Sequence, residues 1–124
     1  MDSRTAFRVA AVLGFLAVAL GAFGAHGLKS LLANHGTTEI WEKAVLYHFV
    51  HTIMLCLLAG RAPLARGPWI SFLLGILIFS GSLYLLAVTN VRWLGAVTPL
   101  GGLAFLTGWV WLAVRPPTTP QAHP

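Results

Sequence analysis

The stretch WISFLLGILIFSGSLYLLAV, residues 69–88, contains no charged side chain over its whole length. A helix rises about 1.5 Å per residue, so a helix of this length crosses the roughly 30 Å hydrocarbon core of a bilayer. The entire chain has the same character, with 57% hydrophobic residues, 9% charged residues and a mean hydropathy of +0.80. Soluble domains have a very different composition. The sequence therefore predicts an integral membrane protein.

Three further apolar stretches are long enough to span a bilayer, and they occupy residues 6–28, 39–60 and 93–114. The first also resembles a secretory signal peptide, because basic residues precede it and Ala22-Phe23-Gly24 has the pattern of a cleavage site. Its apolar stretch is long for that role, and further spans follow it. We therefore predict an all-α membrane protein, a four-transmembrane-helix bundle in one domain at residues 1–115.

Threonine and proline mark the ends of two spans. Thr37 or Thr38 can accept a hydrogen bond as the N-cap of the second span. Pro99 stands near the start of the fourth span, where a missing backbone N–H is tolerated. Proline then ends the last helix, and residues 116–124 are predicted to form a flexible, proline-rich tail.

The basic residues stand singly beside the apolar stretches, at Arg4, Arg8, Lys29, Lys43, Arg61, Arg66, Arg92 and Arg115. This scatter is typical of membrane anchors and provides no basic surface for nucleic acid. With four spans, five of these residues lie on the side of the two termini and three lie on the other side. The positive-inside rule then predicts that both termini face the cytoplasm.

The chain has one cysteine, Cys56, inside an apolar stretch. A single cysteine excludes an internal disulfide, a CxxC redox pair and a zinc site built on cysteine. No HExxH motif is present either. From the sequence we assign no metal ligand, no catalytic residue and no cofactor.

Small residues recur at a spacing of four, which allows two helix backbones to approach each other closely. The candidate packing residues are Ala17, Gly21, Ala25, Ser71, Gly75, Ala104 and Gly108. These faces can serve packing within the bundle, self-association or packing against other membrane subunits.

A small number of polar side chains interrupt the apolar spans, and each needs a partner or a function in lipid. The candidate intramembrane polar patch consists of His26, Glu42, Tyr47, His48, His51, Ser80, Ser82, Tyr84 and Thr98. At about 100° per residue, Tyr47, His48 and His51 fall on one face of the second span. Threading four spans through a bilayer gathers the whole set into one half of its depth.

Three interpretations of this patch are open. The imidazoles could bind a transition metal or haem, or pass protons, and Glu42 could join His26 in a proton relay. The polar groups could instead hydrogen-bond between helices, which fits their types best and specifies geometry more than stability. A lipid, a quinone or another amphiphile could also place its headgroup among them.

Four segments of the chain resemble the DUF423 family of small membrane proteins, which is related to the transmembrane protein 256 group. The segments are Gly21-Ala22-Phe23-Gly24-Ala25-His26-Gly27-Leu28, Trp41-x-x-Ala44-x-x-Tyr47-His48-x-x-His51, Phe79-Ser80-Gly81-Ser82-Leu83-Tyr84, and Thr98-Pro99-x-Gly101-Gly102 with Gly108-Trp109. The resemblance covers the chain apart from its tail. It implies a small polytopic protein of the bacterial inner membrane or of mitochondria, and it implies no particular reaction.

The sequence contains no set of nucleophile, base and orienting group, so we expect no enzyme. We expect a non-enzymatic structural or accessory subunit of a membrane assembly, in the bacterial inner membrane, with lipid and possible further subunits as its partners. The alternative is a module that binds or transports a lipid, quinone, metal or proton through the His/Tyr/Ser patch.

Overall fold

The computed structural model describes residues 1–118, which form helices joined by short connections. Four helical stretches are long and apolar enough to cross a membrane: Ser3–Ala25, Thr38–Ala59, Arg66–Thr89 and Arg92–Val114. The predicted all-α fold with four spanning helices is confirmed. Residues 119–124, most of the predicted tail, lie outside the described residues.

The first span, α1 (Ser3–Ala25), begins and ends three residues earlier than the hydrophobic stretch suggests. Asp2 is its N-cap and accepts a hydrogen bond of 2.7 Å from the backbone N–H of Thr5. This bond holds the pKa of the Asp2 carboxyl below its ordinary value of 3.8. A short helix, α2 (Lys29–His35), follows and ends at Gly36, whose φ of +66° suits glycine.

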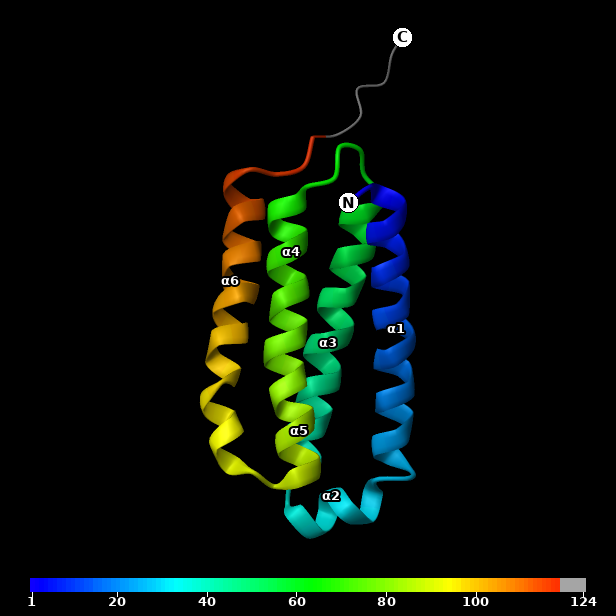
Figure 1. Ribbon diagram of the computed structural model, residues 1–124, viewed down its shortest axis with the longest axis vertical. Helices are drawn as coiled ribbons and strands as arrows, with labels where there is room; N and C mark the ends of the chain where they lie inside the picture. Colours follow the sequence, from blue (N-terminus) through cyan, green and yellow to red (C-terminus); the bar gives the residue numbers. More distant parts are fainter. Residues whose placement is uncertain (119–124) are drawn as a thin grey trace.

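The helix α2 lies across one end of the bundle (Figure 1), where hydrogen bonds hold it and the following residues to the end of the third span and the start of the fourth. The hydroxyl of Thr37 donates to the carbonyl oxygen of Ala87 at 2.8 Å. The same carbonyl is 3.1 Å from Nδ1 of His35, whose own carbonyl accepts from the Arg92 guanidinium at 2.9 Å. Thr37 thus binds a neighbouring helix and makes no side-chain capping bond, in contrast to its predicted role.

The second span is α3 (Thr38–Ala59), and the third span combines three segments. These are α4 (Arg66–Gly75), a π-helical turn η1 (Ile76–Ser80) and α5 (Gly81–Thr89). A π-helical turn changes the direction in which the following side chains point. The sequence showed no sign of this turn.

The fourth span begins with a 3₁₀ turn, η2 (Arg92–Ala96), and continues as α6 (Thr98–Val114). Pro99 occupies the first turn of α6, where its missing N–H removes no internal helical bond. This explains how the span accommodates a proline.

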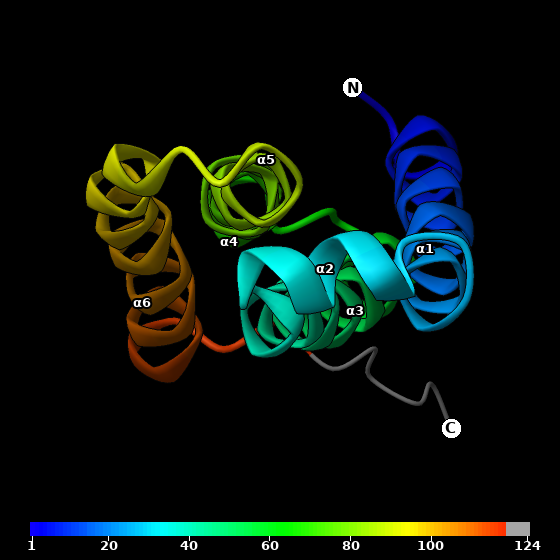
Figure 2. The same ribbon diagram turned by 90° about the horizontal axis from the view of Figure 1, so that it is seen from below.

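The spans lie in a row in which α3 and the third span are central (Figures 1 and 2). The outer helix α1 packs on α3, and the outer helix α6 packs on α4 and η1. The two outer helices do not pack on each other. The N-terminus and the connection between α3 and α4 lie at the end of the bundle that is opposite α2 (Figure 1).

Glycines opposite aromatic rings bring α6 close to the third span. A Cβ atom on Gly75 would lie 2.2 Å from the ring of Phe105, and one on Gly108 would lie 2.6 Å from the ring of Phe72. A Cβ atom on Gly101 would lie 2.3 Å from the backbone nitrogen of Phe79. Of the four predicted packing residues here, Gly75 and Gly108 lie in this interface, while Ser71 and Ala104 are half-buried.

The contact between α1 and α3 uses a slightly different face of α1 than the spacing of four predicts. Ala17 is buried, and a Cβ atom on Gly21 would lie 3.3 Å from the side chain of Val45. Ala25, however, is exposed. Its expected place is taken by Gly24, where a Cβ atom would lie 2.1 Å from the indole nitrogen of Trp41. The helix repeat of 3.6 residues shifts the face by about one position over two turns.

Candidate functional site

His51 in α3 lies at the centre of the largest group of aromatic side chains. Its Nδ1 is 2.8 Å from the carbonyl oxygen of Tyr47, and its Nε2 is 3.0 Å from the indole nitrogen of Trp109. An indole N–H can only donate, so Nε2 accepts and Nδ1 carries the proton that is donated to Tyr47. His51 is therefore the neutral Nδ1–H tautomer, and neither nitrogen is free to bind a metal.

Aromatic rings from two other helices hold His51 in this position. The ring of Phe105 in α6 is stacked on the imidazole at a centroid distance of 3.7 Å, with an interplanar angle of 13°. Phe72 in α4 and Trp109 in α6 cover two further sides at 5.5 and 5.8 Å. Only 5% of His51 is exposed. The imidazole thus connects α3 to both α4 and α6.

His48, one turn earlier in α3, faces α5 and α1. Its Nδ1 forms a hydrogen bond of 2.9 Å with the hydroxyl of Tyr84. The Tyr84 ring packs on Trp41 at 4.8 Å, and the Trp41 indole donates to the carbonyl oxygen of Leu20 in α1 at 3.0 Å. These contacts join α1, α3 and α5.

Two polar atoms beside this group are buried without a hydrogen-bond partner among the described residues. They are Nε2 of His48 and Oγ1 of Thr52, on side chains that are each 3% exposed. The His48 imidazole also lies close to the backbone of Leu13 in α1. The α1–α3 interface therefore contains unused hydrogen-bonding capacity.

The serines of the third span bond to the helices on either side of it. Ser80, at the end of the π-helical turn, donates to the carbonyl oxygen of Ala44 in α3 at 2.8 Å. Ser82 lies 2.6 Å from the Thr98 hydroxyl at the start of α6, and it also donates to the carbonyl oxygen of Phe79 at 3.0 Å. Six of the nine candidate residues thus divide into separate contacts between helices.

The polar side-chain atoms of the other three candidate residues take no part in these hydrogen bonds. His26 and Glu42 are exposed. Among the described residues, neither side chain forms a hydrogen bond with the other or with any third residue. Tyr47 is 39% exposed and contributes its ring, which packs on Phe79 at 4.6 Å, and its backbone carbonyl. The structure therefore does not connect Glu42 and His26 as the suggested proton relay requires.

Several residues outside the predicted polar patch complete the polar contacts. The indole of Trp109 donates to Nε2 of His51, 58 residues away in the sequence. Thr37 and His35 bind Ala87 as described above. Polar atoms in an otherwise apolar chain were the only available signal, and tryptophan and threonine also have ordinary roles at membrane interfaces.

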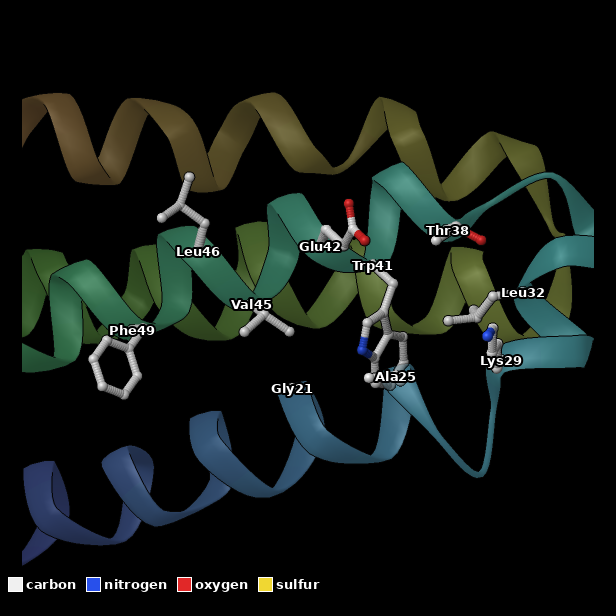
Figure 3. A pocket seen from close by; sticks show the side chains of 11 residues that line it. Gly21, Ala25, Lys29, Leu32, Thr38, Trp41, Glu42, Val45, Leu46 and Phe49 are labelled. Carbon is white, nitrogen blue, oxygen red and sulfur yellow. The ribbon is translucent and has the colours of Figure 1, made fainter.

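A groove lies between α1, α2 and α3 and shares Trp41 with these contacts (Figure 3). We call it the α1–α3 groove, and it has a volume of about 590 Å³. Its apolar part is lined by Gly21, Val45, Leu46 and Phe49, and its polar end by Lys29, Thr38 and Glu42. Glu42 is the one candidate patch residue that lines it. Among the described residues, no group of three or more His, Cys, Asp or Glu side chains could hold a metal ion.

Comparison with known proteins identifies the family to which the chain belongs. The family described as "Protein of unknown function (DUF423)" matches residues 20–102. The UPF0382 membrane protein YwdK of Bacillus subtilis is 41% identical over 111 residues, which cover 84% of this chain and 89% of that protein. The chain belongs to the DUF423/UPF0382 family of membrane proteins.

Further relatives within the DUF423/UPF0382 family come from other bacteria. The UPF0382 inner membrane protein YgdD of Escherichia coli is 40% identical over 121 residues, or 92% of this chain and 90% of that protein. A UPF0382 membrane protein of Haemophilus influenzae is 43% identical over 107 residues, or 83% and 86%. No solved structure matches the chain. The region matched to the family contains all nine candidate patch residues and ends before Trp109.

Proposed function

We propose that this DUF423/UPF0382 protein is a non-enzymatic structural or accessory subunit of a membrane assembly. The observation that carries the proposal is the state of His51, whose two nitrogens both serve contacts with other parts of the protein. A general base needs a nitrogen that can take a proton from a substrate. Ser80 and Ser82 are likewise engaged with neighbouring helices. The polar groups thus act in positioning helices.

The outer helices support a role within an assembly. Each outer helix packs against its neighbouring span with one face only, so its opposite face is turned toward lipid or another protein. On α1 that side includes Phe15, 72% exposed, and Val18, 62% exposed. On α6 it includes Leu106 and Val110, both 61% exposed. These faces are available to a second copy of the chain or to other subunits.

The assembly is tested by extracting the protein at its natural abundance from native membranes and weighing the particles by native mass spectrometry. We expect complexes that contain partner chains in addition to the 13.3 kDa chain. Enlarging an outer residue, as in Val18→Trp or Leu106→Trp, should release the partner bound to that face. Recovery of the monomer alone from native membranes would contradict the proposal.

The proposed location is the bacterial inner membrane with both termini in the cytoplasm. The relative YgdD is named an inner membrane protein, which supports the location. Five of the eight basic residues belong to the end of the molecule that holds the N-terminus, which supports the orientation. These residues are Arg4, Arg8, Arg61, Arg66 and Arg115.

A second candidate function has one specific observation in its favour. The unpartnered Nε2 of His48 and Oγ1 of Thr52 could bind a water molecule or take up a proton between α1 and α3. In liposomes loaded with a pH-sensitive dye, proton entry through the wild-type protein would then be lost in His48→Phe and retained in His51→Phe. Equal proton entry with and without the protein would exclude this function.

A further inference from the structure

We propose that the α1–α3 groove binds one phospholipid whose headgroup carries both a phosphate and a primary ammonium, as in phosphatidylethanolamine. The two parts of the groove differ in chemistry as the two parts of such a lipid do. Its walls are apolar along α1 and α3, and its end beside α2 presents one basic and one acidic side chain. Its volume of about 590 Å³ lies within the range of small-molecule sites.

The length of the groove corresponds to one leaflet. Thr38 lies at its polar end and Phe49 at its apolar end (Figure 3). These residues are separated by 11 positions in α3, or about 17 Å of helix. Half of the hydrocarbon core is about 15 Å thick. The groove therefore suits an acyl chain of one leaflet, with its headgroup at the end of the molecule opposite the N-terminus.

The floor of the groove is rigid. The Trp41 indole forms it and is held by its hydrogen bond to the carbonyl oxygen of Leu20. Trp41 is 4% exposed and lies against Gly24, where no Cβ atom would fit. A floor fixed in this way keeps the groove open without a ligand, which reduces the entropy lost on binding.

The charges at the polar end select the headgroup. Lys29 and Glu42 are both exposed and line the groove, and their charged groups lie apart in Figure 3. Lys29 can bind the phosphate, and the Glu42 carboxylate can accept hydrogen bonds from a primary ammonium. A quaternary ammonium has no N–H to donate, and a purely anionic headgroup is repelled by Glu42. The pair of side chains thus favours an ethanolamine headgroup.

The test is native mass spectrometry of the purified full-length protein with phosphatidylethanolamine, phosphatidylcholine and phosphatidylglycerol of equal chain length. We expect one phosphatidylethanolamine to bind at least fivefold more tightly than either of the others. Equal binding of the three lipids would overturn the proposed headgroup selection.

Two pairs of variants locate the site. Ala25→Trp fills the groove and should weaken binding at least tenfold, whereas Ala22→Trp, on an exposed position of α1 outside the groove, should not. Glu42→Gln should abolish the preference for ethanolamine, whereas Glu39→Gln, outside the groove, should keep it. Undiminished binding in Ala25→Trp would overturn the site. The charge variants lie on exposed positions, so they remain informative should Ala25→Trp fail to fold.

Discussion

At the scale of single residues, His51 shows how a polar side chain is accommodated in an apolar interior. Its two nitrogens have complementary partners, a carbonyl acceptor at Tyr47 and an indole donor at Trp109. The stacked Phe105 ring excludes further partners. Each bond is worth little by itself in a membrane, but an unmet buried nitrogen is unfavourable. The contact therefore acts mainly by selecting one arrangement of α3 and α6.

Removing the indole donor tests this contact. Trp109→Phe keeps an aromatic ring but leaves Nε2 of His51 without its partner, so we expect unfolding to require about 1 kcal/mol less free energy. Trp93→Phe is the matched control, because Trp93 is 68% exposed. Unfolding in mixed detergent micelles, followed by circular dichroism, measures both. Equal stability of the two variants would show that the bond contributes nothing.

The N-cap of α1 predicts a pH dependence. The pKa of Asp2 is lowered in the folded protein, chiefly by the backbone hydrogen bond from Thr5. Its contribution is therefore complete above the ordinary value of 3.8 and is lost as the pH falls through the lower folded value. Hydrogen exchange at Thr5 should accelerate at that pH, relative to the remainder of α1. Asp2→Asn caps without titrating, so this relative acceleration should disappear; its persistence would refute the assignment.

At the scale of elements, the helices meet where glycine on one faces an aromatic ring on another. This applies to Gly75 and Phe105, to Gly108 and Phe72, and to Gly24 and Trp41. The π-helical turn η1 then directs Ser80 toward the carbonyl of Ala44 in α3. Close backbones and redirected side chains together let short polar groups reach a neighbouring helix.

Glycine substitutions distinguish close packing from simple helix preference. Gly24→Ala would place a methyl group 2.1 Å from the indole nitrogen of Trp41, so we expect a loss of about 1–3 kcal/mol. Gly81→Ala is the control, because nothing lies within 4 Å of its Cβ position, and alanine should stabilise α5 slightly. Thermal unfolding in detergent ranks the two. A Gly24→Ala protein as stable as Gly81→Ala would argue against the close contact.

At the scale of the whole molecule, the buried polar contacts and the α1–α3 groove occupy different parts of the row of spans. The buried polar contacts run through α3, the third span and α6, whereas the α1–α3 groove opens toward the bilayer beside α2. The N-terminus and the α3–α4 connection share the opposite end (Figure 1). The orientation of this row decides which leaflet the groove meets.

Labelling with a membrane-impermeant maleimide determines that orientation. In a Cys56→Ala background, we expect Asn34→Cys to react in intact spheroplasts, because it is exposed in α2 on the outer side. Ala62→Cys, exposed in the connection between α3 and α4, should react only after the membrane is permeabilised. The reversed pattern would place the termini outside.

Much of this architecture follows from local chemistry. Uninterrupted apolar stretches specify four helices because a bilayer requires every backbone hydrogen bond to be met within its segment. Helical periodicity places His48 and His51 on one face of α3, and an even number of spans brings the two ends of the helical domain to one side.

The pairing of helices depends on rotation and register, which apolar periodicity specifies poorly in a chain that is hydrophobic on all faces. Helix rotation and register decide three features: the bond between His51 and Trp109, the use of Gly24 in place of the predicted Ala25 in the α1 contact, and the exposure of His26. The α1–α3 groove also depends on it, because Lys29 and Glu42 line one groove only when α2 folds back over α3. Contacts between residues distant in sequence form only when side chains of complementary shape are brought together.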